Sequence, residues 1–443
     1  MTTRSRLLWT SPVAAAALAS ALLLAGNPAW GGNGQGDNEG KDDRGAVNLL
    51  GAVPIPGTAA NLTNGKMYSF DISFVDQSTQ TYYLADRSNA AVDVIDASTG
   101  TFVKQISAGF AGVAVVNGSV TTAQSGPNGV VAAFPWLFVT DAASRVVSID
   151  LRTDAVVSSV STGGADKLRA DELAYDPKDG LLLVVNNADT PPFATLIAVN
   201  KSTGQLTVGA RITLDAAHGV DATDGAEQPV WVSATGKFYV SIPQIGANVK
   251  DGGVVRIDPK TAAVDATYPV QFCGPAGLTL GPRQNLLVGC NKVFDTAGNV
   301  WSPSGAVTAA PKAVILDVKS GSTTDVLGVG AGDEVWFNRG DGKYYVTGSG
   351  SPLRPTLSSA AQGSTPLGVI DAEDKTLVQL VPTFNVPAVG TGNSSTQHPA
   401  GNAHSVAANA ANNYVFVPLG ANNVFPGCLT GCIAVFARPS KEE

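Results

Sequence analysis

Acidic residues recur at one position of a repeated two-strand pattern. Counting back nine residues from the turn of each clear hairpin reaches an ionisable residue in five of six copies, and Ala276 is the exception. The five residues are Asp71, Asp171, Glu227, Asp333 and His404. A seventh, shorter copy does not align cleanly, and Asn128 is its nearest polar residue. If the fold brings these positions together, the carboxylates repel one another unless a cation compensates them.

Two of these positions carry a second acid, because Glu172 follows Asp171 and Glu334 follows Asp333. A hard cation such as Ca²⁺ takes about six to eight oxygen ligands. The acids therefore predict a divalent cation site, most simply for Ca²⁺. Its expected ligands are Asp71, Asp171, Glu227, Asp333 and Glu334. The competing interpretation is that these acids are solvated at a wet channel mouth and bind nothing.

The three histidines occur in or just before this pattern. His404 occupies the recurrent position, and together with Glu172 it is the candidate general acid or base. His218 and His398 lie in long insertions that precede the recurrent position of their copies, so both are candidate ligand-binding residues. A third long insertion, residues 108–126, precedes Asn128. These insertions are expected to gather over one face, where binding sites commonly form.

A repeat that occurs seven times must position these residues. Each copy has two strands joined by a turn, as in DELAYDPKDGLLLVVN, and a third strand ending in a polar turn such as VDVIDASTG. Six copies continue into a fourth strand. Four antiparallel strands per copy predict a propeller blade, so the fold class is all-β, a seven-bladed β-propeller. A six-bladed ring with one misread repeat is the alternative.

The last copy lacks its fourth strand, since the chain stops at ARPSKEE. Residues 46–57, AVNLLGAVPIPG, have the pattern of the missing strand and are expected to complete that blade and close the ring. A single propeller domain is therefore predicted for residues 46–440. Residues 1–31 resemble a signal peptide, with Arg4 and Arg6 before a short apolar run. The glycine-rich residues 32–45 are expected to be a disordered leader.

Composition limits the compartment and the partners. The net charge is −8 without a basic stretch, which argues against nucleic acid as a partner. No segment after the leader is long and apolar enough to span a membrane. Four cysteines in an exported chain favour two disulfides, Cys273–Cys290 around a hairpin and Cys428–Cys432 in PGCLTGC. A periplasmic or secreted monomer is expected.

The second strands YYLAD, LFVTD, FYVSI, YYVTG and YVFVP resemble the signature of bacterial YVTN-type β-propellers. The resemblance covers nearly the whole mature chain. It implies the fold but no single activity, because such propellers include surface-layer, cofactor-associated and binding proteins. A similarity to gluconolactonase-like propellers, which hold a divalent cation on the axis with Glu, Asn and Asp, would assign Glu172 or Glu334, Asn187 and Asp71. Those propellers have six blades.

Two functions are consistent with these patterns. The first is an exported binding protein that holds a small ligand, a cation or a partner protein at the acid-lined mouth of the channel, on the face that carries the long insertions. The alternative is a divalent-metal-assisted hydrolase, lactonase or lyase with its site on the axis. The chain contains no G-x-S-x-G, H-E-x-x-H, Walker, Rossmann or C-x-x-C-H motif, which argues against a serine hydrolase or a nucleotide enzyme.

Overall fold

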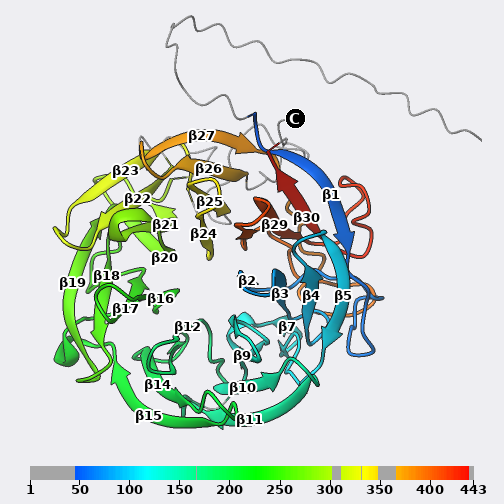
Figure 1. Cartoon of the computed structure of the whole chain (residues 1–443), viewed down its shortest axis with the longest axis horizontal. Coiled ribbons are helices and arrows are strands. Elements are labelled where there is room, and N and C mark those ends of the chain that lie inside the picture. Colours follow the sequence, from blue (N-terminus) through cyan, green and yellow to red (C-terminus); the bar gives the residue numbers. More distant parts are fainter. Residues whose placement is uncertain (1–44, 166, 302–310, 331, 348–365, 439–443) are drawn as a thin grey trace, which may run out of the picture. The chain divides into compact units, whose positions relative to one another are not determined.

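The computed structural model describes residues 45–165, 167–301, 311–330, 332–347 and 366–438. The predicted signal peptide and all of the predicted leader except Gly45 lie outside these ranges. The described residues form seven four-stranded antiparallel sheets, which stand around a central axis as the blades of a propeller (Figure 1). The seven-bladed prediction is confirmed, and the six-bladed alternative is excluded.

The first four blades follow one another along the chain, each from its innermost to its outermost strand. Blade one contains β2 (Ser73–Asp76), β3 (Thr81–Asp86), β4 (Ala91–Asp96) and β5 (Thr101–Ile106). Blade two contains β8 (Val130–Ala133), β9 (Trp136–Asp141), β10 (Arg145–Asp150) and β11 (Ala155–Ser161). Blade three contains β12 (Leu173–Asp176), β13 (Leu181–Asn186), β14 (Phe193–Val199) and β15 (Leu206–Thr213). Blade four contains β16 (Pro229–Val232), β17 (Lys237–Ile242), β18 (Asp251–Asp258) and β19 (Ala263–Gln271).

The last three blades complete the ring. Blade five contains β20 (Cys273–Leu280), β21 (Asn285–Val293), β22 (Lys312–Asp317) and β23 (Thr323–Leu327). Blade six contains β24 (Val335–Asn338), β25 (Lys343–Thr347), β26 (Leu367–Asp371) and β27 (Thr376–Val381). Blade seven contains β28 (Ala407–Asn409), β29 (Tyr414–Leu419), β30 (Cys432–Ala437) and β1 (Asn48–Pro54).

Strand β1 closes the ring as the outermost strand of the last blade. It pairs antiparallel with β30, from Asn48 opposite Ala437 to Pro54 opposite Cys432. The predicted pairing of the first strand with the last sheet is therefore confirmed. Since β30 would otherwise expose a free edge, this pairing satisfies backbone groups that would invite association with another chain.

Turn chemistry explains why the repeat forms hairpins. In blade one, the Asp96 carboxylate accepts hydrogen bonds from the Ser98 backbone N–H at 2.8 Å and from its hydroxyl. Gly100 then takes a φ of +67°, a conformation that glycine adopts without steric cost. Alternating buried side chains form the cores between blades; the core between blades seven and one includes Tyr82, whose ring packs on that of Phe416.

Both predicted disulfides are present. Cys273 and Cys290 join β20 to β21 with 5.2 Å between their Cα atoms. Cys428 and Cys432 close a short loop that leads into β30. Both bonds are local and therefore fasten individual blades rather than the ring as a whole.

Backbone hydrogen bonds join neighbouring blades where their innermost strands begin. Ile72 N–H donates to Asn128 O at 3.2 Å, and Gly129 N–H donates to Asp171 O at 3.1 Å. Glu334 N–H donates to His404 O at 3.1 Å in the same way. The recurrent positions found in the sequence are thus held next to one another around the axis.

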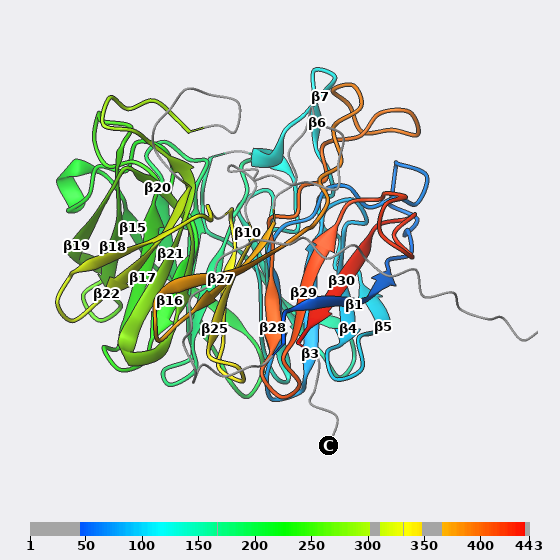
Figure 2. The ribbon, with the colours of Figure 1, turned by 90° about the horizontal axis from the view of Figure 1, so that it is seen from above.

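Loops gather at the end of the channel where the innermost strands begin. The hairpin of β6 (Val115–Val116) and β7 (Ser119–Val120) lies beside the loop of residues 382–406 (Figure 2). Val120 N–H donates to Thr391 O at 2.7 Å, which ties the two loops together. We call this end the loop face and the opposite end, where the hairpin turns lie, the turn face.

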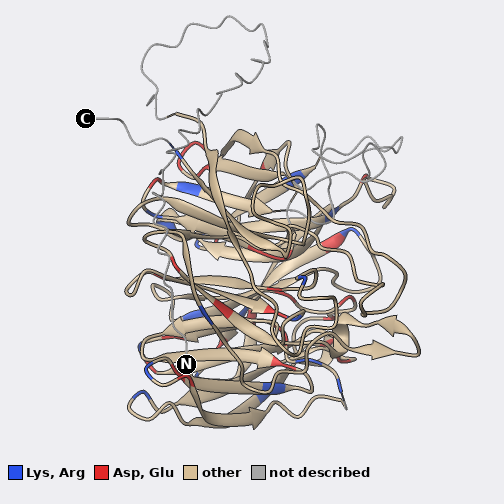
Figure 3. Ribbon diagram, turned by 90° about the vertical axis from the view of Figure 1, so that its right-hand side faces the viewer, with Lys and Arg blue, Asp and Glu red and all other residues tan. Residues whose placement is uncertain are grey.

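Helices contribute little to this fold. The described residues contain three short 3₁₀ helices, Thr122–Gln124, Ala216–His218 and Pro282–Gln284. Within the described part of the chain, no helix has the length and apolar character needed to cross a membrane. Acidic and basic positions are interspersed over the blades and loops (Figure 3).

Candidate functional site

The recurrent acids begin the innermost strands at equivalent positions of their blades. The backbone N–H groups of Asp71, Asp171 and Glu227 donate to the second strand of the same blade, at 2.8, 2.8 and 2.9 Å. Asn128 makes the same contact in blade two, with Thr140 O at 2.9 Å. Because these strands surround the axis, their first residues meet at the loop-face end of the channel. This agrees with the geometry inferred from the repeat.

Two arginines that the sequence analysis did not single out compensate these acids. Arg87 is paired with Asp71, and its Nε and Nη2 atoms donate to Asn128 Oδ1 at 2.9 and 2.8 Å. Arg169 Nη2 donates to Asp171 Oδ2 at 2.8 Å, and its Nη1 lies 3.8 Å from Asp71 Oδ2. We define the mouth cluster by its six charged members: Asp71, Arg87, Arg169, Asp171, Asp333 and His404.

The missed arginines do have a signal in the sequence. Asp71 pairs with Ala85 across the first hairpin, so Arg87, two residues further on, projects to the same side of the strand pair. Arg169 likewise precedes Asp171 by two residues. Both positions therefore follow from the strand-start register and from the pairing of the first hairpin.

His404 lies in the mouth cluster between two carboxylates. Its Nε2 is 3.6 Å from Asp71 Oδ1, and its Nδ1 donates to Asn402 O at 2.7 Å. The ring stacks on Phe70. Burial lowers the pKa of His404, but contact with the Asp71 carboxylate and the charge of Asp333 outweigh it, so the pKa is raised. Protonated His404 therefore offsets part of the negative charge of Asp71 and Asp333.

The pKa shifts of the mouth acids differ in direction, because the neighbouring cations outweigh the effect of burial at Asp71 but not at Asp171 or Asp333. Burial raises the pKa of Asp71, but Arg87, His404 and Arg169 outweigh it and lower the pKa to about 2. Burial raises the pKa of Asp171 to about 6, against the opposing effect of Arg169. The pKa of Asp333 is also raised by burial, and its Oδ1 accepts from Asn291 Nδ2 at 3.4 Å. Asp71 is the most firmly ionised carboxylate of the cluster.

A metal-ligand arrangement exists within the mouth cluster. Asp71, Asp333 and His404 each offer one ligand atom, and these atoms lie within 4.8 Å of one another. However, Asp71 already pairs with Arg87 and lies near Arg169, so a divalent cation here would face two guanidinium charges. Three other ligands were predicted. Asp171 is paired with Arg169, Glu227 lines a separate hollow, and Glu334 accepts a hydrogen bond from the Ser73 backbone N–H. This donor set fits a divalent cation poorly.

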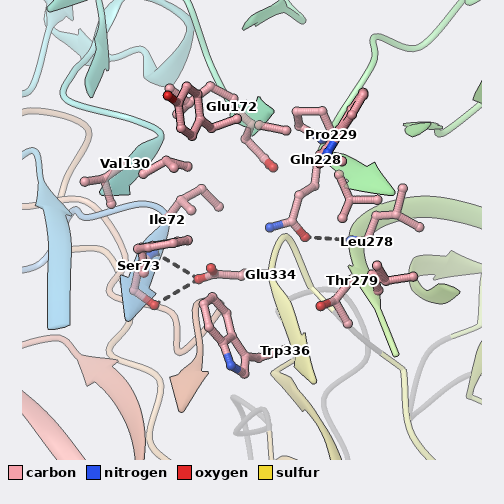
Figure 4. A pocket seen from close by; sticks show the side chains of 18 of the residues that line it. Ile72, Ser73, Val130, Glu172, Gln228, Pro229, Leu278, Thr279, Glu334 and Trp336 are labelled. Carbon is pink, nitrogen blue, oxygen red and sulfur yellow. Dashed lines mark hydrogen bonds between the residues drawn. The ribbon is translucent and has the colours of Figure 1, made fainter. Parts of the chain in front are cut away.

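Below the mouth cluster, the innermost strands of six blades surround a channel cavity of about 470 Å³. Its walls are mainly apolar, and five aromatic side chains contribute to them: Phe74, Tyr175, Trp231, Trp336 and Phe337. All five are partly exposed. Glu172, Gln228 and Glu334 are also in the lining, and their head groups point toward the same open space (Figure 4).

Glu334 is surrounded by hydrogen-bond donors. Its Oε2 accepts from the backbone N–H of Ser73 at 3.0 Å and of Val406 at 3.1 Å. The hydroxyls of Ser73 and Ser405 also donate to this oxygen. Burial nevertheless raises the pKa of Glu334 to about 8, despite these hydrogen bonds. The site therefore presents a carboxyl group that hydrogen-bond donors orient and that forms no ion pair with the part of the chain that the structure describes.

Glu172 is less well satisfied than Glu334. It is 3% exposed, and its Oε2 has no hydrogen-bond partner among the described residues. Burial raises its pKa well above the ordinary value, and the charges of Asp171 and Glu227 raise it further. A buried polar atom without a partner is costly and often marks a site that a ligand or water completes.

Gln228 supplies a donor of fixed direction. Its Oε1 accepts from the Leu278 backbone N–H at 2.6 Å. Because a backbone N–H can only donate, this contact fixes which end of the amide faces β20 and turns the NH₂ group into the cavity. The channel cavity thus offers one amide donor beside two carboxyl groups.

The remaining candidate residues lie apart from this cavity. His218 is exposed and its Nδ1 contacts Asp215 at 2.6 Å, while His398 stacks on Tyr68 with 3.6 Å between ring centroids. Asn187 lies beside Arg169, with 3.4 Å from its Oδ1 to Arg169 Nε. Asn187 and Glu227 also line a separate polar hollow of about 720 Å³. The fold therefore brings Asn187 near the mouth but gives both histidines other contacts.

Comparisons with known proteins identify the architecture alone. No family model and no curated protein matches the chain. Among solved structures, Kuenenia stuttgartiensis Hydrazine Synthase is 13% identical, with a TM-score of 0.57 over 91% of this chain and 99% of that chain. A chain of the Mitotic Checkpoint Complex is 10% identical, with a TM-score of 0.55 over 95% and 100%. At such identities the likeness shows a shared fold and no shared function.

Proposed function

We propose that this protein is an exported binding protein that holds a small molecule in the channel cavity. The observation that carries this proposal is Glu172, which lines a cavity of about 470 Å³ and whose buried Oε2 has no hydrogen-bond partner within the described ranges. Ligand pockets typically have volumes of about 300–1,000 Å³, apolar walls and a few directed polar groups. Glu172, Gln228 and Glu334 are such groups here.

Access to the cavity is proposed at the turn face. Asp71, Arg87 and Asp171 are 6%, 4% and 2% exposed, so the mouth cluster largely fills the loop-face end of the channel. The loop that carries Ala123 packs on this cluster, because the Ala123 carbonyl accepts a hydrogen bond from the backbone N–H of Arg169 at 2.9 Å. The partly exposed aromatic side chains instead lie along the strands that lead to the turn face. This differs from the ligand position expected from the sequence, which was the acid-lined mouth.

Export is part of this proposal. Two disulfides support an oxidising compartment. The apolar run near the N-terminus, which follows Arg4 and Arg6, supports a signal peptide. Cell fractionation, with disulfide state measured by thiol alkylation, tests this part separately from ligand binding.

A blocked channel tests the binding function. Thr279 lines the cavity, so Thr279→Trp fills part of it, whereas Thr323→Trp places the same side chain at an exposed position of the same blade. Native mass spectrometry of secreted protein, and thermal shift with a small-molecule library, should detect a ligand for the wild type and Thr323→Trp. Thr279→Trp should lose it. An undiminished response in Thr279→Trp would contradict the proposal.

The alternative is a metal-assisted hydrolase or lyase, and the Asp71, Asp333 and His404 arrangement is the observation that favours it. The neighbouring arginines argue against it. Metal content of the purified protein, and its melting temperature with EDTA or added Ca²⁺, decide between the two. A stoichiometric ion whose removal lowers the melting temperature by several degrees would support the alternative.

A further inference from the structure

The channel cavity is lined by two carboxyl groups that have no cationic partner among the described residues, unlike the acids of the mouth cluster. No ion pair among the described residues involves Glu172 or Glu334, whereas Asp71 and Asp171 both pair with arginine. The charged groups that act most strongly on Glu172 are Asp171, Glu227, Asp71 and Asp333, all of them acids. An added positive charge would therefore stabilise the ionised forms of these two carboxyl groups.

The contacts of Glu334 favour its ionised form. The N–H groups of Ser73 and Val406 can only donate, so the oxygen that accepts from both carries no proton. Donors directed at a carboxylate stabilise the anion, and burial is the effect that opposes them. A ligand that brought a positive charge would offset the burial and leave the donors in place.

The walls suit an organic cation better than a hydrated metal ion. Phe74 and Trp336 pack edge to face with 5.6 Å between their ring centroids. Trp231 lines the cavity from blade four. Aromatic faces attract ammonium groups, and their apolar surface accommodates a hydrocarbon body. A hard ion would need roughly six oxygen ligands, more than these two carboxyl groups and one amide provide.

We infer that the ligand of the channel cavity is an organic cation, an ammonium group on an apolar body, with its charge beside Glu172 and Glu334 and its body against the aromatic walls. This inference rests on the proposed binding function and specifies its ligand class. The NH₂ group of Gln228 adds a donor for a polar atom near the ammonium group.

Three probes that share a phenyl ring on a two-carbon chain test this inference: phenethylammonium, which is positively charged over the pH range used, neutral phenethyl alcohol and anionic phenylacetate. Binding is measured by calorimetry near pH 8.5. The cation should bind at least about tenfold more tightly than the alcohol, the factor expected for a desolvated cation–π contact with a nearby carboxylate.

The affinity for the cation should fall as the pH drops to about 6, because Glu334 takes up a proton over this range. Proton release, measured in two buffers of different ionisation enthalpy, should accompany binding.

Variants separate charge from shape. Glu172→Gln keeps the side-chain size, so it should lose about tenfold in affinity for the cation and none for the alcohol. Glu373→Gln, at an exposed site paired with Arg283, is the matched control and should bind as the wild type does. Equal binding of the cation and the alcohol, or tighter binding of phenylacetate, would overturn the cation inference and leave the binding function standing. If no probe binds and Thr279→Trp behaves as the wild type in the library screen, the binding function itself fails.

Discussion

Two regions of the channel use the same residue types in opposite ways. At the mouth, Asp71 and Asp171 are paired with arginines. Glu172 and Glu334, each one residue further along the chain than a mouth acid, form no ion pair with any described residue. Successive side chains of a strand point in opposite directions, so neighbours in the sequence enter different surroundings. Acids at neighbouring positions of a strand start therefore do not form one site: Asp71 and Asp171 form ion pairs, whereas Glu172 and Glu334 line the channel cavity.

The largest effect is expected from breaking the mouth cluster. Arg87→Met removes the main partner of Asp71, a carboxylate that is 6% exposed. Since an unpaired buried charge is strongly unfavourable, the free energy of unfolding in urea should fall by about 3–5 kcal/mol. The double variant Asp71→Asn with Arg87→Met should lose less than Arg87→Met alone, because the two effects are coupled. A loss under about 1 kcal/mol would show that the pair matters little.

A substitution in the channel cavity is expected to raise the free energy of unfolding rather than lower it. Glu172→Gln should raise the free energy of unfolding near pH 8 by about 1–3 kcal/mol, because it removes a buried carboxyl group whose Oε2 lacks a partner among the described residues. The pKa of Glu172 is raised in the folded protein, so its stability contribution is fully present below the unfolded pKa, about 4.3, and is lost as the pH rises. The variant should therefore match the wild type near pH 4. A variant less stable than the wild type at pH 8 would contradict this.

A smaller gain is expected from Glu334→Gln. The neutral amide avoids the cost of burying a charge but accepts more weakly from Ser73 and Val406, so the two effects partly cancel. We expect a gain of about 1 kcal/mol above pH 8. Because the pKa of Glu334 is raised to about 8, wild-type stability should decline as the pH rises toward that value. Urea unfolding across this pH range should show a shallower decline for the variant.

The smallest effect concerns His404. Its pKa, measured by NMR, should lie above 6.5 in the wild type and fall in Asp71→Asn, because that carboxylate stabilises the imidazolium. The stability contribution of a raised histidine pKa is present at low pH and is lost as the pH rises through the folded value. His404→Gln should accordingly cost under about 1 kcal/mol at pH 8. An unchanged His404 pKa in Asp71→Asn would separate this residue from the mouth cluster.

Much of the fold followed from pattern. The repeated hairpins predicted seven blades, and the strand-like residues 46–57 predicted the closure by β1, which the pairing from Asn48 to Pro54 confirms. Cysteines around one hairpin and within one short loop predicted both disulfides. These features depend on local periodicity and on the neighbouring strand, which are properties that a sequence displays directly.

The site was only partly predictable. The strand-start register placed Asp71, Asp171 and Asp333 near the axis, but it did not include Arg87 or Arg169, whose guanidinium groups decide the charge of the cluster. Grouping Glu334 with the mouth acids followed from its position beside Asp333, whereas its carboxyl group instead accepts hydrogen bonds from Ser73 and Val406 in blades one and seven. Contacts across three blades leave no periodic trace along the chain.

The sequence by itself determined a ring of repeated sheets, its closure and the presence of acids at the starts of the innermost strands. Only the tertiary structure decided which of those acids meet a cation and which face an apolar cavity. The reason is physical: hydrogen-bond and hydrophobic periodicity act between chain neighbours and paired strands, while the pKa of a buried carboxyl group depends on charges a few ångströms away in any direction. Asp171 and Glu172 share a strand start, and three-dimensional packing alone separates their roles.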